Sequence, residues 1–97
     1  MYRYTTPTIV LRLPISTDII EEAYYTLKQD DVIVEKTLES MTKEDNELRV
    51  WLSQEDTGKF HFGAVTMQLR IRDVNGNAYA SQKQQMPVET VLKEGVI

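Results

Sequence analysis

The sequence predicts an all-β fold, a small antiparallel immunoglobulin-like β-sandwich of six or seven strands with one short helical turn. Three observations lead to this prediction. Apolar and polar residues alternate strictly over residues 64–72, which is the period of a strand and not of a helix. Turn-forming residues recur about every ten residues, as in sandwiches and barrels. No segment with helical periodicity is long enough to connect two parallel strands.

The composition predicts one domain over residues 1–97, in which residues 88–97 form an apolar C-terminal tail. The 41% of hydrophobic residues suffice for one modest core. The chain has no cysteine, so we expect neither a disulfide nor a thiolate metal site, in keeping with a reducing cytoplasm. No segment reaches the length of a membrane span, and the N-terminus lacks the apolar stretch of a signal peptide. We therefore expect no membrane partner and a protein that is cytoplasmic when made.

The first part of the chain predicts an edge strand and then a loop. Residues 8–13 read TIVLRL, and their β-branched and aliphatic side chains favour a strand. Pro7 and Pro14 flank them, and because proline has no N–H donor, this strand suits the edge of a sheet. Residues 16–22 predict a loop or a single helical turn, capped by one of the polar residues 16–18.

The next segment predicts a β-hairpin. Residues 23–29 alternate in polarity, Asp30 and Asp31 form a tight turn, and residues 32–37 read VIVEKT as the second strand. The Asp-Asp pair specifies the turn less strongly than Asn-Gly would. Residues 38–46 fit either a continued strand or a short helical turn that ends in a polar turn.

Residues 47–52 predict another strand, followed by a short helix. The side chains expected to face inward are Leu48, Val50 and Leu52, and those expected to face outward are Arg49 and Trp51. Ser53 followed by Asp56 resembles a capping box, with Asp in place of the usual Glu or Gln. We expect one helical turn that Gly58 limits, with Phe60 packed beneath it.

The clearest strand is followed by a turn and a return strand. Residues 64–72 alternate over four full repeats. Asn75 and Gly76 predict a type I′ hairpin turn, because both residue types accept positive φ angles. Residues 78–86 would then be the return strand, ended by Pro87.

No arrangement of residues points to catalysis, a metal or a cofactor. His61 is the only histidine, and a general base or metal ligand needs positioned partners. The acidic pairs at 30–31 and 55–56 are explained as a solvated turn and as the first turn of a helix. Residues 73–77 share letters with calcium loops, but the twelfth position is Gln84 instead of a bidentate Glu. We therefore expect a protein that is not an enzyme and has no cofactor.

The charge disfavours nucleic acid as a partner. The formal net charge is −4, and residues 1–49 carry ten acidic against six basic residues. A protein that follows a phosphate backbone shows a basic face instead. We therefore expect a protein partner or self-association.

The candidate partner-binding residues are outward-facing arginines and aromatics. Arg49, Arg70 and Arg72 lie on outward strand faces, where they can join Trp51 in one cation–π or partner-binding patch. Tyr79 adds aromatic surface of the kind that interfaces favour. The alternative is that these are ordinary solvated strand faces.

The tail is too apolar to be a free linker. Its apolar residues beyond Val88 are Val91, Leu92, Val96 and Ile97. Two arrangements remain open, docking on the tail's own sandwich or docking on a neighbouring molecule. Pairing with a neighbour's edge strand would make the protein a homo-oligomer.

Three segments of the chain carry a resemblance, residues 1–14, 48–81 and 91–97. The middle segment carries the pattern LSQEDT, then Phe60 and Gly63, then the alternating strand. Together they resemble a class of short uncharacterised proteins encoded among the virion structural genes of bacterial prophages and phage-like elements. More loosely, the chain is similar to the small β-sandwich domain that starts some phage baseplate upper proteins, where it attaches a larger fibre. With no fibre appended here, the resemblance implies a free-standing accessory or connector subunit, with the virion as its destination.

The leading hypothesis is therefore a non-enzymatic phage or prophage structural or accessory protein that acts in protein–protein assembly. One alternative is an acidic inhibitor or decoy of a host nucleic-acid-binding protein, which the acidic first half allows. Another is a carbohydrate-binding module, since Trp51 and the tyrosines can stack on sugars if they are exposed.

Overall fold

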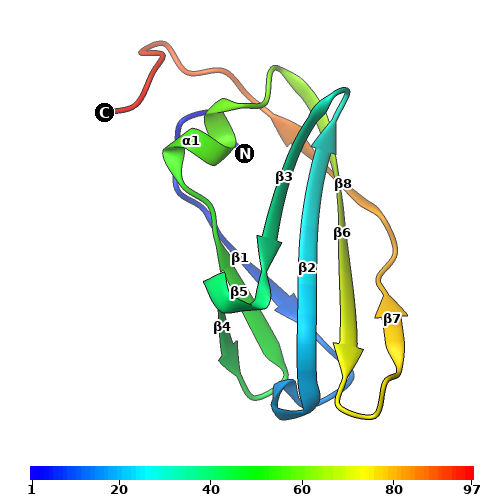
Figure 1. Cartoon of the computed structure of the whole chain (residues 1–97). Coiled ribbons are helices and arrows are strands. Elements are labelled where there is room, and N and C mark those ends of the chain that lie inside the picture. The colour runs from blue at the N-terminus through cyan, green and yellow to red at the C-terminus, as the bar shows by residue number, and fades with distance from the viewer.

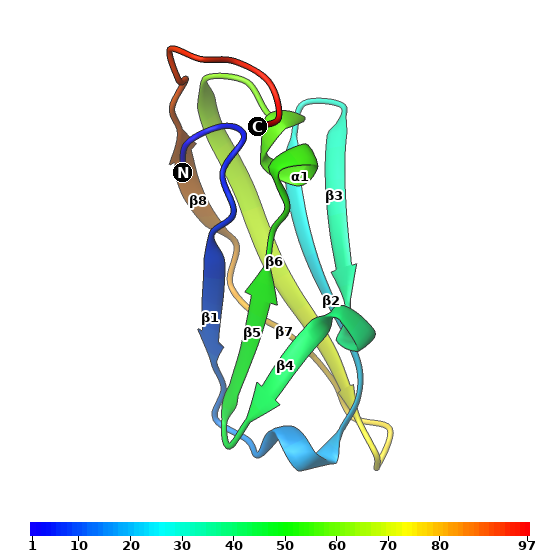
Figure 2. The ribbon, with the colours of Figure 1, turned by 90° about the vertical axis from the view of Figure 1, so that its left-hand side faces the viewer.

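All 97 residues are described by the computed structural model, and they form two antiparallel sheets packed face to face (Figures 1 and 2). The three-stranded sheet has the order β1-β5-β4. The five-stranded sheet has the order β3-β2-β6, and β7 and β8 both pair with the remaining edge of β6. The all-β sandwich predicted from the sequence is confirmed. None of the helices has the length and apolar character of a membrane span.

The elements follow the predicted order with adjusted bounds. The strands are β1 (Thr8–Arg12), β2 (Ile20–Gln29), β3 (Val32–Thr37), β4 (Met41–Glu44), β5 (Glu47–Trp51), β6 (Gly63–Asp73), β7 (Ala78–Ala80) and β8 (Gln84–Val88). The helices are the short α1 (Gln54–Gly58) and two 3₁₀ turns, Thr17–Ile19 and Leu38–Ser40. Eight strands replace the six or seven expected, because residues 41–44 form a strand of their own and the return strand is split.

The core lies between the sheets and is built by alternate residues of the long strands. β6 buries the apolar side chains of its inward row, which are Val65, Met67, Leu69 and Ile71. β5 faces this row with its own inward residues, Leu48 and Val50, both fully buried. Phe60 is fully buried and follows α1 directly, as the sequence predicts.

The turn after β6 differs from the predicted type I′ hairpin. Only Gly76 has a positive φ angle, 84°, whereas Asn75 does not. The N–H groups of Asn75 and Asn77 donate to the Asp73 carboxylate, and the Gly76 N–H donates to the Asp73 carbonyl. These bonds favour a type I turn followed by a glycine in the left-handed region. This combination is the common three-residue hairpin loop.

The return strand is interrupted, and Pro87 does not end it. Between β7 and β8, Ser81 bonds Leu69 of β6 in an irregular way. Its N–H donates to the Leu69 carbonyl, but the Leu69 N–H is bonded by the Ser81 hydroxyl instead of by a backbone carbonyl. Pro87 lies inside β8, opposite Ala64. It is tolerated there because β8 is an edge strand and needs no donor on its outer side.

Candidate functional site

The short helix α1 is the element that organises one end of the sandwich. Its predicted capping box is present, with the Ser53 hydroxyl accepting from the Asp56 N–H at 3.1 Å and the Asp56 carboxylate accepting from the Ser53 N–H at 2.9 Å. Lys36 Nζ of β3 lies 2.7 Å from the same carboxylate. Burial opposes ionisation of Asp56, but the bonds from Lys36 and Ser53 outweigh it and hold the pKa of Asp56 below its usual value.

The N-terminal segment is attached directly to α1. The Thr57 hydroxyl accepts from the Thr5 N–H at 2.9 Å and donates to the Thr5 carbonyl at 2.8 Å. The Tyr4 ring packs against Gly58 so closely that a Cβ on Gly58 would lie 2.4 Å from Tyr4 Cε1. Thr57 and Gly58 therefore belong to the attachment of the first residues, a role that their positions in the sequence do not reveal.

Arg3 links the N-terminal segment to the tail. Its guanidinium donates to the Phe60 carbonyl at 2.6 Å and to the Gly58 carbonyl at 3.1 Å. It also forms an ion pair with Glu94 at 2.6 Å. Since one side chain holds three segments, it fixes the path of the tail over this end of the molecule.

The end of the tail is held through its backbone. The Gln54 side-chain amide donates to the Ile97 carbonyl at 2.9 Å and accepts from the Ile97 N–H at 2.8 Å. The tail thus lies on its own chain, as one of the two predicted arrangements requires, but its polar groups make most of these contacts. Sequence reasoning missed both Gln54 and Arg3 as the groups that hold it.

The apolar side chains of the tail face solvent. Leu92 is fully exposed, Ile97 is 88% exposed and Val96 is 56% exposed, whereas Val91 is half-buried and lines a small cleft beside Arg3. Tyr2 and Phe62 are also exposed, and their segments meet the tail at the α1 end, where both termini lie (Figures 1 and 2). We call this set the apolar end, comprising Tyr2, Phe62, Leu92, Val96 and Ile97.

The single arginine–tryptophan patch predicted from the sequence is wrong. Arg49 and Trp51 lie on the outer face of the three-stranded sheet, and Arg70 and Arg72 lie on the outer face of the five-stranded sheet. The two pairs therefore point away from each other on opposite sides of the sandwich. Alternation along a strand separates inward from outward residues, but it does not say which sheet the strand joins. Trp51 is 53% exposed, as its predicted outward position requires.

Tyr79 lies on neither arginine face. It pairs with Ile71, and residues directly opposite share a face of the sheet, so its ring lies on the core side of the sheet edge. Its hydroxyl donates to the Asp73 carboxylate at 3.0 Å, and this bond raises the pKa of Tyr79. Burial opposes ionisation of Asp73, but the bonds from the Asn77 N–H and the Tyr79 hydroxyl outweigh it and lower the pKa of Asp73. Tyr79 therefore stabilises the β6–β7 turn.

His61 connects the loop after α1 to the β2–β3 turn. Its Nδ1 lies 2.9 Å from the Phe62 carbonyl and its Nε2 lies 2.9 Å from the Asp30 carboxylate. The Phe62 carbonyl and then Asp30 raise the pKa of His61. The buried Gln29 reinforces this junction, because its side-chain amide bonds both the N–H and the carbonyl of His61. The arrangement holds a corner of the fold, and no cluster of three or more metal-ligating side chains occurs in the structure.

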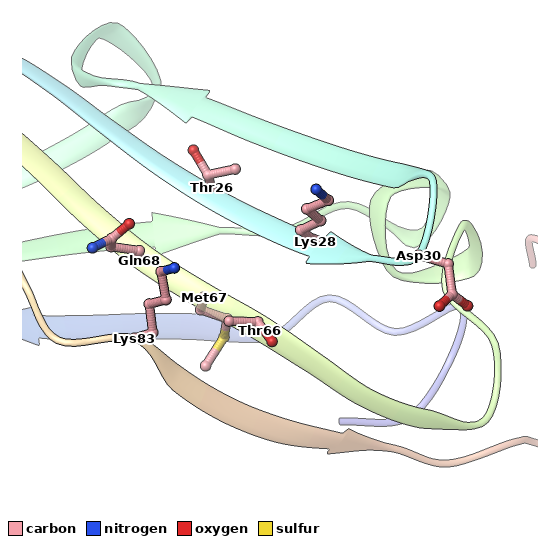
Figure 3. Close-up of a pocket in the computed structure, with 7 residues that line it drawn as sticks. All are labelled: Thr26, Lys28, Asp30, Thr66, Met67, Gln68 and Lys83. Atoms are coloured by element: carbon pink, nitrogen blue, oxygen red, sulfur yellow. The ribbon is translucent and has the colours of Figure 1, made fainter.

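A shallow polar hollow of about 410 Å³ lies on the outer face of the five-stranded sheet (Figure 3). Thr26 and Lys28 of β2, Thr66 and Gln68 of β6, and Lys83 line it (Figure 3). The Thr26 hydroxyl donates to Glu35 and the Gln68 amide donates to the Ser81 carbonyl. Sequence reasoning named none of these residues, because two strands and a loop that are distant in sequence form the hollow.

Comparison with known proteins identifies no relative of this chain. The chain matches no protein-family model, no curated protein and no solved structure. A functional proposal therefore depends on the residues described above and on the resemblance of the sequence segments.

Proposed function

We propose that this chain is a non-enzymatic structural or accessory protein of a phage or prophage particle, and that it joins other proteins through the apolar end. The resemblance of the three sequence segments supports the phage origin. The observation that carries the assembly role is that Gln54 holds the tail backbone and Arg3 holds the Glu94 side chain, while Leu92, Val96 and Ile97 face solvent.

The energetics are compatible with binding through this surface. Burying a Leu or Ile side chain that is exposed in the free protein contributes about 1.5–3 kcal/mol. The tail loses little conformational freedom on binding, because hydrogen bonds and an ion pair already order it. Lys93 and Glu94 place charges beside the apolar residues, as in interfaces with an apolar centre and a polar rim. The partner we expect is a protein with an apolar pocket.

A binding experiment with a matched control tests this proposal. The double variant Leu92→Ser/Ile97→Ser removes the two most exposed apolar side chains of the tail, and the control Val74→Ser removes an exposed apolar side chain from the β6–β7 turn. Each virion protein encoded in the same phage or prophage element is purified and measured against the three proteins by calorimetry. We expect one of them to bind the native chain and Val74→Ser equally, and the double variant at least about tenfold more weakly. If none binds, or if the double variant binds as well as the native chain, the proposal is wrong.

A further inference from the structure

Strand β1 is an open edge of the three-stranded sheet. It pairs only with β5, and no strand lies on its other side (Figure 2). The Leu13 N–H and the Pro7 carbonyl bond to the β5 side. Backbone groups alternate in direction along an antiparallel strand, so Thr8, Val10 and Arg12 direct their N–H and carbonyl groups away from the sheet.

The other sheet edges carry features that oppose further pairing. On β3, the side chain of Lys36 points inward to Asp56, and an inward charge is a recognised protection of an edge strand. β4 has four residues and ends in Lys43 and Glu44. On the remaining edge, β7 and β8 are short and Pro87 lies within β8. β1 is as short as β8 and carries the exposed Arg12, but its prolines lie outside it, so all of its outward N–H groups remain free to pair.

The open edge also leads to the hydrophobic core. A cleft of about 190 Å³ runs beside β1, and it is lined by Leu11 and Leu13 of the β1 segment and by Met67 and Leu69 of β6, among others. Leu11 and Leu13 are only partly buried although they pack against the core. A strand added to β1 would cover these side chains while pairing with the free backbone groups.

We propose that two copies of this chain associate by antiparallel pairing of β1 with β1, with the twofold axis at Val10. Val10 then faces Val10 of the second copy, and Thr8 faces Arg12 of the second copy at both ends of the pairing. Each of these residue pairs exchanges two backbone hydrogen bonds. The two three-stranded sheets become one continuous sheet. This goes beyond the function proposed above, since the partner is a second copy and the surface is not the apolar end.

The side chains favour this register over the neighbouring ones. Val10 is 46% exposed at the middle of the strand, and Trp51 lies diagonal to it on the same outer face. Pairing across Val10 sets the two valines side by side on the outer face. On the β5 side, each valine has Arg49 directly opposite it and the Trp51 ring on the diagonal. The Arg12 side chain is 87% exposed and faces Thr8, whereas an axis at Arg12 would set two arginines opposite each other.

An edge contact of this length is smaller than the roughly 1,200–2,000 Å² of stable interfaces, so we expect dissociation at micromolar or higher concentrations. Sedimentation equilibrium from about 1 µM to about 1 mM should show a transition from the 11.2 kDa chain to a species of twice that mass. A native chain that remains monomeric over this range would overturn the proposal.

The variant Val10→Pro tests the geometry. It removes the outward N–H of Val10 and no bond to β5, and edge strands tolerate proline at such positions. Val10→Thr is the matched control, because it keeps the N–H and the branched shape. We expect Val10→Pro to weaken dimerisation at least about 100-fold and Val10→Thr less than about tenfold, with unchanged circular dichroism. Equal dimerisation of Val10→Pro and the native chain would contradict the pairing.

Hydrogen exchange of the native chain gives a test that does not depend on the variant's folding. The Val10 amide should exchange more slowly as the concentration rises, while the Leu13 amide, already bonded to Asn46, should not change. Exchange at Val10 that is independent of concentration would refute the proposal. The variant Leu92→Ser/Ile97→Ser should dimerise like the native chain, which separates a failure here from a failure of the apolar end.

Discussion

At the scale of single residues, Gly58 shows how a close contact rather than a special backbone angle requires glycine. The Tyr4 ring occupies the space that a side chain at position 58 would need, at 2.4 Å from an added Cβ. We predict that Gly58→Ala lowers the free energy of unfolding by about 1–3 kcal/mol, the usual cost of overpacking. Urea denaturation monitored by Trp51 fluorescence measures it.

The same substitution in a Tyr4→Ala background is the control for this contact. With the ring absent, Gly58→Ala should cost little or even stabilise the chain, because alanine favours a helix over glycine by about 1 kcal/mol. An equal loss in both backgrounds would show that the ring is not the cause.

At the scale of elements, α1 depends on its attachments, since a helix of five residues cannot be stable alone. The folded-state pKa of Asp56 lies below its ordinary value. Asp56 therefore stabilises the fold above the unfolded-state pKa of about 3.9, and this contribution is lost as the pH falls through the lower folded-state value. We predict that Asp56→Asn costs about 1–2 kcal/mol at neutral pH and less at about pH 2, as measured by urea denaturation.

Glu55→Gln is the matched control, because Glu55 lies in the same helical turn and forms no ion pair in the structure. We expect it to change the free energy of unfolding by less than about 0.5 kcal/mol at both pH values. If Asp56→Asn were equally harmless, or if its cost were constant with pH, the carboxylate would not be what holds α1.

The elements that the sequence predicts well are those whose cause is local. Burial of one face of β6 imposes the alternation of residues 64–72, and the Ser53–Asp56 capping box lies within four consecutive residues. The missed features depend on side chains that bond a different part of the backbone. Asp73 changes the type of the following turn, and Ser81 interrupts the return strand by bonding Leu69.

The candidate site was less predictable for a related reason. The exposure of Trp51 follows from alternation, but its separation from Arg70 and Arg72 depends on which sheet each strand joins. The attachment of the tail likewise needs Gln54 and Ile97 to meet across 43 positions of the sequence. Such contacts are properties of the three-dimensional fold, and no short pattern encodes them.

At the scale of the whole molecule, the two terminal segments meet at one end but contribute differently to it. The N-terminal segment pairs with the end of the last strand, where the Arg3 N–H donates to Glu89 and the Glu89 N–H donates to Met1. Its Tyr4 ring also packs directly against Gly58, and its Thr5 N–H donates to the Thr57 hydroxyl. The tail beyond residue 90 is held by its bonds to Arg3 and Gln54 and leaves the side chains of Leu92, Val96 and Ile97 exposed.

We therefore predict opposite outcomes for the two truncations. Deleting residues 91–97 should leave a cooperative unfolding transition with a Tm within about 5 °C of the native chain, since its lost bonds are exposed. Deleting residues 2–5 should lower the Tm by more than about 10 °C, because several partly buried hydrogen bonds of about 1 kcal/mol each disappear together. Differential scanning calorimetry compares the two variants directly. If the tail deletion were the more damaging one, the tail would be part of the core structure, and its apolar side chains would no longer be available as a surface for a partner.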